Sequence, residues 1–143
     1  MPPTDHASPS PFAAISAIDY TVIFTRDMEA MRAFYETVMG FSHLRSLSPN
    51  WHEYRIGPNT LALAKPGLTP DDAPLPHGSA ALQLAFRVPT ATVDACAEML
   101  DTQGIPVLSP PADRNFGSFT HRTLFFRDPD GNVLEIYAEF ATP

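Results

Sequence analysis

The sequence has little cysteine, no run of basic residues and no long apolar stretch. With Cys96 as its single cysteine, the chain cannot form an intrachain disulfide, and it has no cysteine cluster for zinc or iron–sulfur. No run of roughly 18 apolar residues occurs, so a membrane-spanning helix is not expected. Residues 1–11 have neither the basic start nor the apolar core of a signal peptide. We therefore expect a soluble, cytoplasmic protein.

The charge balance excludes two classes of partner. The formal net charge is -7, and the arginine and lysine side chains are scattered along the chain. Nucleic acid and anionic membrane surfaces need a basic patch to offset phosphate charge, so neither is expected as a partner. Apolar residues make up 44% of the chain, which is enough to bury one core in an ordinary domain or in two small modules that share it.

Proline divides the chain into parts. The sixteen prolines gather outside the periodic segments, chiefly in residues 2–11, 58–89 and 106–111. Residues 1–14 have little to bury and are predicted to form a flexible arm. Residues 66–80 hold proline, glycine and aspartate without apolar periodicity, which is typical of a linker.

The remaining chain falls into two modules, residues 15–65 and 81–140. The first begins with an alternating strand over 15–25, followed by an amphipathic helix with Asp27 as N-cap and Gly40 beyond its end. Three more strands are predicted, at 41–47, 51–56 and 60–65.

The second module repeats this order. A strand over 81–88 precedes a helix capped by Thr90 or Thr92, and the end of the module is predicted as a short strand at 105–108, a loop at 110–116 and a hairpin. An offset of 63 residues places Tyr20 on Gln83, and an offset of 73 near the module ends places Ala62 on Glu135. This register predicts two copies of one β-α-β-β-β unit.

The hairpin carries the most specific sequence pattern. Two apolar runs, 123–126 and 133–137, flank Asp128-Pro-Asp-Gly-Asn132, where Pro129 fixes φ and Gly131 can adopt a positive φ. Period-two alternation places Glu135 on the same strand face as Val133 and Tyr137. That face is therefore either solvated or part of a functional cavity.

The stretch Phe126-Arg-Asp-Pro-Asp-Gly-Asn-Val-Leu-Glu135 resembles the terminal motif of the vicinal oxygen chelate superfamily, and Ile18-Asp-Tyr-Thr-Val-Ile-Phe-Thr-Arg-Asp27 resembles its first strand. The superfamily includes glyoxalase I, extradiol dioxygenases and bleomycin-resistance proteins. The resemblance implies an α+β fold in which two tandem βαβββ modules form curved mixed sheets around a central cleft.

The resemblance also implies a divalent metal in that cleft, held by four positions that correspond here to Tyr20, Ala62, Gln83 and Glu135. Glu135 is a good ligand and Gln83 a weak one, Tyr20 would have to bind as phenolate, and Ala62 cannot bind. We expect a degraded site that holds no cofactor, unless His52, Glu53 or His121 faces inward and restores a divalent metal.

Several side chains are candidates for ligand binding or acid–base chemistry. Glu135 is predicted either to pair with Arg122 or Arg127, or to act as a base or hydrogen-bond acceptor inside a cavity beside Tyr20 and Gln83. Trp51 offers a stacking surface. His52 and His121 are more typical of ordinary strand-end residues, since no Asp, Ser or Cys is spaced to form a triad with them.

Two functions follow as hypotheses. The first is a small-molecule-binding protein that has lost its metal and holds a planar or cationic ligand in an aromatic-lined cleft, in the manner of bleomycin-resistance proteins. The second is a glyoxalase-type lyase or isomerase, or a dioxygenase-like enzyme, that uses Glu135 with or without a divalent metal. In either case we expect a homodimer, because sheet edges in this architecture are available for pairing and modules can be swapped.

Overall fold

The computed structural model describes residues 10–18, 20–66 and 82–143. The predicted linker at 66–80 lies outside these residues except for residue 66, and of the predicted arm only residues 10–14 are described, with the short 3-10 helix η2 (Pro11–Ala14). None of the described helices has both the length and the apolar character needed to cross a membrane.

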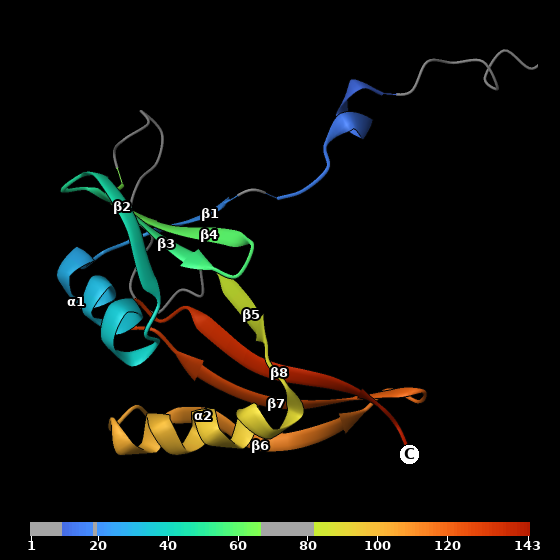
Figure 1. The fold of residues 1–143 in the computed structure, drawn as a ribbon. Helices are drawn as coiled ribbons and strands as arrows, with labels where there is room; N and C mark the ends of the chain where they lie inside the picture. Colours follow the sequence, from blue (N-terminus) through green and yellow to red (C-terminus); the bar gives the residue numbers. More distant parts are fainter. Residues whose placement is uncertain (1–9, 19, 67–81) are drawn as a thin grey trace, which may run out of the picture.

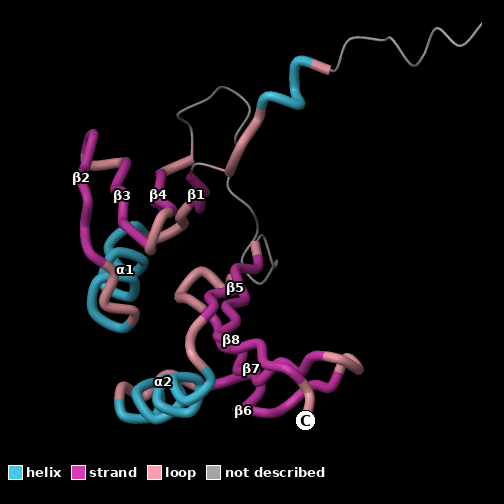
Figure 2. Tube along the Cα trace, turned by 45° about the vertical axis from the view of Figure 1, so that its right-hand side comes forward, coloured by secondary structure: helices cyan, strands magenta, loops and turns pink. Residues whose placement is uncertain are grey.

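Each module folds as one four-stranded mixed sheet with a helix on one side (Figures 1 and 2). The first module consists of β1 (Tyr20–Phe24), α1 (Met28–Ala33), η3 (Phe34–Val38), β2 (Ser42–Ser48), β3 (Trp51–Ile56) and β4 (Asn59–Ala64). The second consists of β5 (Gln83–Arg87), α2 (Thr90–Thr102), β6 (Val107–Asn115), β7 (Phe119–Arg127) and β8 (Val133–Ala141).

The strand orders are β1-β4-β3-β2 and β5-β8-β7-β6, which confirms the predicted duplication. The parallel pair of the first sheet aligns Tyr20 with Thr60, and that of the second aligns Gln83 with Val133. The predicted offsets of 63 and 73 residues therefore join residues at equivalent places in the two sheets.

Local sequence explains most of these elements. The Asp27 side chain accepts a hydrogen bond from the Ala30 backbone N–H at 3.0 Å, so the predicted N-cap is confirmed. The predicted cap of α2 is wrong, because Pro89 occupies the N-cap position and no side chain caps the helix. The predicted first strand also began too early, since β1 starts at Tyr20.

The predicted loop at 110–116 is wrong as well. Residues Val107–Asn115 form β6, although two prolines lie inside it. The strand lies at the edge of its sheet, and its pairing with β7 shifts register on both sides of Ser109. Proline is tolerated there because an edge strand does not need every N–H for pairing.

Alternation gives each sheet two distinct faces. The helix face packs on α1, η3 or α2 and carries the shared core, which includes Ile23, Tyr54, Leu61, Leu134 and Ile136. The opposite side, called the open face below, is not covered by a helix (Figure 1). On sheet one Tyr20 and Phe24 lie on the open face and are 52% and 49% exposed, so this face is only partly shielded from water.

The Asp128–Asn132 turn joins the two modules. The Asp128 carboxylate accepts hydrogen bonds from the backbone N–H groups of Asp130 and Asn132 at 3.0 Å each, and from the Asn132 side chain at 2.8 Å. It also accepts one at 2.8 Å from the Tyr35 hydroxyl, which belongs to η3 of the first module. Burial and the Asp128 charge raise the pKa of Tyr35, so this hydroxyl stays protonated.

The adjoining residues add to this connection. The Arg26 backbone N–H donates to Asp130 Oδ2 and its guanidinium donates to the Asp130 carbonyl oxygen, both at 2.8 Å. Phe41 packs on Phe86 with ring centroids 5.6 Å apart. The motif that carries the resemblance therefore has a structural role, because it ties the second module to the first.

Candidate ligand-binding site

The open face of sheet two holds a cluster of rings around His121. The centroid of the His121 ring lies 5.2 Å from Phe116, 5.3 Å from Phe119 and 5.0 Å from Tyr137. Phe116 and Phe119 stack on each other at 5.3 Å. The two phenylalanines are 53% and 38% exposed, so their rings are accessible to a ligand.

Glu135 lies on the same face, in the middle of β8. Its neighbours in register are Phe125 on β7 and Ala85 on β5, which are both apolar. Within the described residues the carboxylate, which is half-buried, makes no hydrogen bond or ion pair. An ionised carboxylate in such surroundings lacks compensation unless a ligand or water supplies it.

The predicted ion pairs of Glu135 are not formed. Arg122 instead binds Asp94 and Asp113 at 2.8 and 2.9 Å on the helix side of the sheet. Arg127 donates to the Gly131 carbonyl oxygen at 2.7 Å. Both arginines lie on β7, the first strand of the hairpin, and the alternation along this strand places Arg122 on the face opposite Glu135.

Further polar groups lie on the same open face. Gln83 pairs with Val133, so it lies diagonally across from Glu135. The Glu139 carboxylate accepts from His121 Nε2 at 2.9 Å and lies 3.9 Å from the Arg87 guanidinium. The predicted site residues Gln83, His121 and Glu135 thus share one face of one sheet.

The open face of sheet one carries the other predicted aromatic residues. The Tyr20 and Trp51 rings meet edge to face with centroids 6.1 Å apart. Beside them Glu53, only 6% exposed, accepts from Trp51 Nε1 at 2.7 Å and from Arg45 Nε at 3.0 Å. Glu53 pairs in register with Ala62, so a carboxylate stands next to the position where the resembled family has a ligand.

The side chains at the four family metal positions do not fit a divalent ion. Ala62 has no donor atom, Tyr20 is a phenol, and Gln83 offers a neutral amide, which leaves Glu135 as the one anionic ligand. Glu53 lies on the open face next to Ala62, where it could have restored a metal site. Both of its carboxylate oxygens, however, already accept hydrogen bonds from protein side chains. Across the described part of the chain, no group of three or more His, Cys, Asp or Glu could hold a metal ion.

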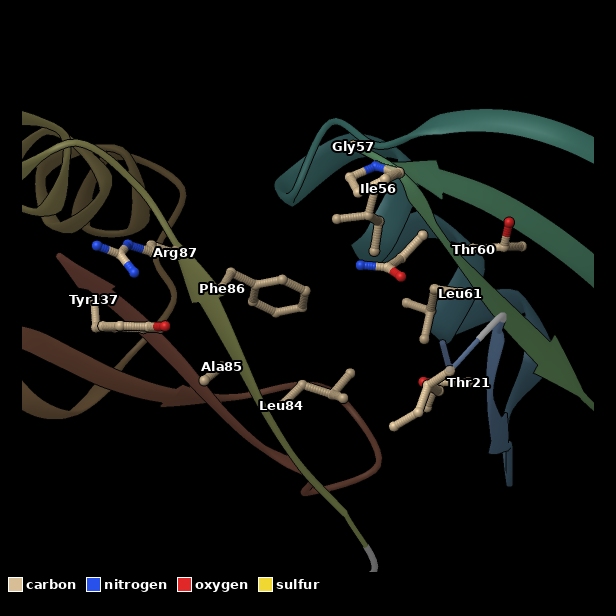
Figure 3. A pocket seen from close by; sticks show the side chains of 13 residues that line it. Thr21, Ile56, Gly57, Thr60, Leu61, Leu84, Ala85, Phe86, Arg87 and Tyr137 are labelled. Atoms are coloured by element: carbon tan, nitrogen blue, oxygen red, sulfur yellow. The ribbon is translucent and has the colours of Figure 1, made fainter. Parts of the chain in front are cut away.

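One chain does not bring the two open faces together. In Figure 3, Leu84 and Phe86 of β5 point toward Thr21, Ile56 and Leu61 of the first module, and they line a depression of about 560 Å³. Ala85, Arg87 and Tyr137 lie on the other side of β5 in this view, although they also contribute to the lining of this depression. The modules therefore meet through their helix-face side chains, and the Trp51 face and the Glu135 face remain separate.

His52 lies on a different face from Trp51. It is 4% exposed, lies on the helix face of sheet one, and makes a hydrogen bond of 2.6 Å between its Nδ1 and Ser46 Oγ. Ser46 therefore contacts this histidine, but the other ring nitrogen lies against the Pro49 carbonyl oxygen, so no acidic side chain completes a triad here. Ser46 was missed because the turn at residues 49–50 folds β2 onto β3 and aligns two residues that are not adjacent in sequence.

Comparisons with known proteins agree with this architecture. Residues 17–136 match the family model described as Glyoxalase/Bleomycin resistance protein/Dioxygenase superfamily. The virulence protein STM3117 of Salmonella typhimurium is 30% identical over 124 residues, which cover 85% of this chain and 83% of that protein.

Solved structures are similar over most of their length. A lactoylglutathione lyase from Agrobacterium tumefaciens has a TM-score of 0.68 and 26% identity, over 87% of this chain and 94% of its own. A glyoxalase/bleomycin resistance protein/dioxygenase from Nocardioides has a TM-score of 0.74 and 25% identity, over 94% and 88%. The family model matches most of the chain, and the structure shows the duplicated unit with its strands in equivalent register. The chain therefore belongs to the glyoxalase/bleomycin resistance/dioxygenase superfamily.

Proposed function

We propose that this protein binds a planar, positively charged small molecule on the open face of sheet two. The observation that supports this most is the half-buried Glu135 carboxylate between Phe125 and Ala85, which has no hydrogen-bond or ion-pair partner among the residues that the structure describes. A cation at this point would supply the missing charge partner, and the accessible rings of Phe116 and Phe119 would stack on a flat ligand.

The same proposal includes a homodimer. The open face of sheet one exposes Tyr20 and Phe24 and holds Trp51, whereas the acidic residues for a cation lie on sheet two. If a second copy places its sheet one over sheet two, Trp51 closes the aromatic cleft above Glu135. In this arrangement each chain supplies one wall of each site.

We also propose that binding needs no metal, since one carboxylate and one amide cannot fill a coordination sphere. Glu135 instead acts through its charge and as a hydrogen-bond acceptor for an amine or hydroxyl of the ligand.

The second candidate function is a lyase or isomerase of the glyoxalase type, or a dioxygenase-like enzyme. The unpartnered Glu135 favours it too, since a carboxylate in apolar surroundings can serve as a general base for a proton next to a carbonyl group. The similarity to a lactoylglutathione lyase is consistent with such chemistry. In this reading Glu135 removes the proton, with or without a divalent metal that holds the substrate oxygens.

The test uses the fluorescence of Trp51, which is the single tryptophan of the chain. Titration with a planar cationic dye such as acridine orange is expected to quench the fluorescence of Trp51 at saturating ligand. We also expect the dialysed protein to hold no transition metal. Glu135→Gln is expected to weaken dye binding roughly tenfold, because a desolvated charge pair contributes on the order of 1.5 kcal/mol. Glu98→Gln, an exposed acid on α2, is the matched control and should bind as the wild type does.

Equal dye affinity in the wild type and the Glu135→Gln variant would overturn the binding proposal. One equivalent of bound metal, together with turnover of a hemithioacetal that is lost in Glu135→Gln while affinity persists, would favour the enzyme instead.

A further inference from the structure

The β2–β3 hairpin holds a serine and two histidines that the proposed ligand site does not use. Ser46 Oγ lies 2.6 Å from His52 Nδ1 and 2.8 Å from His43 Nε2. His52 Nε2 lies 3.0 Å from the Pro49 carbonyl oxygen. These side chains are on the helix face of sheet one, away from the open face that carries Trp51.

The acceptors fix the positions of the protons. The Pro49 carbonyl oxygen can only accept, so the proton of a neutral His52 ring must be on Nε2. Nδ1 is then a bare acceptor and takes a hydrogen bond from the Ser46 hydroxyl. Because that hydroxyl has a single proton, its oxygen accepts the proton of His43 Nε2. The result is a hydroxyl donating to an imidazole whose other nitrogen is held by a third group, which is the arrangement of an activated nucleophile.

His52 and Ser46 differ in how far they are exposed to solvent. His52 is 4% exposed, so its ring is held in place, whereas Ser46 is exposed and can meet a substrate. The strand pairing shifts register between Ser46 and Ser48, and such bulges redirect side chains. His52 and Pro49 also line an open depression of about 450 Å³ together with Met28, Glu29, Arg32 and Glu36, so the ring that contacts Ser46 borders a space large enough for a small acyl group.

We propose that Ser46 is the nucleophile of an acyl-transfer site, with His52 as its general base, that accepts small esters with good leaving groups. This activity goes beyond the proposed ligand binding and does not depend on it. The Pro49 carbonyl oxygen orients the ring but has no charge to stabilise an imidazolium. The site therefore suits activated esters and not amides.

The reaction proceeds in two balanced steps. Ser46 Oγ bonds to the acyl carbon while its proton passes to His52 Nδ1, and the ester C–O bond then breaks as the leaving alcohol takes this proton. Water next attacks the acyl-serine, gives one proton to His52 Nδ1 and forms the acid, and that proton returns to Ser46 Oγ as the acyl–oxygen bond breaks.

The experiment measures covalent labelling of the full chain by a fluorophosphonate probe, located by peptide mass spectrometry, and hydrolysis of p-nitrophenyl acetate. We expect the label on Ser46 alone, with fluoride displaced, and loss of label and turnover in Ser46→Ala. Ser48→Ala is the matched control, because Ser48 Oγ lies on the same strand and accepts from the Asn50 N–H at 3.1 Å without a histidine partner. It should be labelled like the wild type.

His52→Gln tests the base, with the thermal midpoint measured in parallel since the residue is buried. Labelling is expected to fall about 100-fold in a variant that remains folded, the lower range for loss of a general base. If His52→Gln does not fold, the comparison of Ser46→Ala with Ser48→Ala tests the proposal. Both serines lie at the exposed end of the hairpin, so these two variants are expected to fold. An unlabelled wild type, equal labelling of Ser46 and Ser48, or a folded His52→Gln that labels at the wild-type rate would overturn the proposal.

Discussion

At the scale of single residues, Asp128 shows how the family motif stabilises the fold. Four donors converge on its buried carboxylate, and one of them, the Tyr35 hydroxyl, comes from the other module. Hydrogen bonds to a charged group contribute more than neutral ones, and each donor left without an acceptor inside the protein adds a desolvation cost. The Asp128–Asn132 turn therefore contributes to stability directly, whereas Glu135 at the end of the same motif makes no hydrogen bond or ion pair with the described residues.

Removing the Tyr35 hydroxyl tests this role. We expect Tyr35→Phe to lower the free energy of unfolding by about 1.5–3 kcal/mol, because a bond to a charged acceptor is lost while three donors remain on Asp128. Asp128→Ala should cost more, since it leaves four donors without an acceptor. Urea unfolding followed by circular dichroism measures both. Tyr137→Phe, on the open face, is the control and should change stability by less than about 0.5 kcal/mol.

If Tyr35→Phe is as stable as the wild type, the contact between Tyr35 and Asp128 does not hold the modules together in solution.

At the scale of elements, sequence periodicity predicted the strands and helices well where apolar side chains alternate. β3, β4 and β8 lie at or near their predicted positions, and the DPDGN turn separates β7 from β8 clearly. Burial alternates along β8, whereas β4 is buried on both faces from Leu61 to Ala64. β6 was predicted as a short strand at 105–108 followed by a loop, because proline suggests a loop and the sequence does not reveal that this strand lies at an edge. The five residues of η3 form a π-helical turn that helical spacing alone does not distinguish from an α-helix.

The candidate site was predictable in part for the same reason. Glu135 stood out because period two separates it from Leu134 and Ile136, and those neighbours are indeed buried. The Ser46–His52 contact depends on strand pairing, which no pattern within either strand encodes. Whether Tyr20 and Glu135 share one cleft depends on how modules pack, and this is a property of side chains far apart in the sequence.

The helix α2 gives an element-scale prediction, because it places Cys96 on its partly buried stripe. Burial raises the pKa of this thiol. We expect native Cys96 to react with Ellman's reagent at pH 8 about tenfold or more slowly than in the unfolded chain, since the thiolate is the nucleophile. The raised pKa also contributes stability that is present below the pKa of the unfolded thiol, near 8.5, and is lost as pH rises through the folded value.

A cysteine moved to the outer side of the same helix serves as the control. Cys96→Ser combined with Asp101→Cys exposes a thiol on α2 and should react at nearly the unfolded rate. Equal rates for native Cys96 and for this variant would show that the helix face does not protect the thiol.

At the scale of the whole molecule, the two open faces complement each other in chemistry but do not meet within one chain. Sheet one offers Tyr20, Phe24 and Trp51, and sheet two offers Glu135 and the His121 ring cluster. The helix-face contacts between modules leave both surfaces accessible. Exposed apolar and aromatic patches are typical of a surface that another protein copy or a ligand covers.

The homodimer proposed above follows from this arrangement, and Phe24 is the residue that tests it. Phe24→Glu places a charge on the open face of sheet one, so we expect size-exclusion chromatography with light scattering to show dimers for the wild type and mainly monomers for the variant. The monomer should keep its far-UV circular dichroism, because Phe24 is 49% exposed and outside the shared core. Dye quenching of Trp51 should disappear with the dimer, since Glu135 and Trp51 would no longer share a cleft.

Met99→Glu is the control for this prediction. It changes a residue on α2 that is 53% exposed, so the variant should remain dimeric. A wild-type chain that stays monomeric at about 100 μM, or a Phe24→Glu variant that still forms dimers, would contradict a dimer in which the two open faces form one cleft.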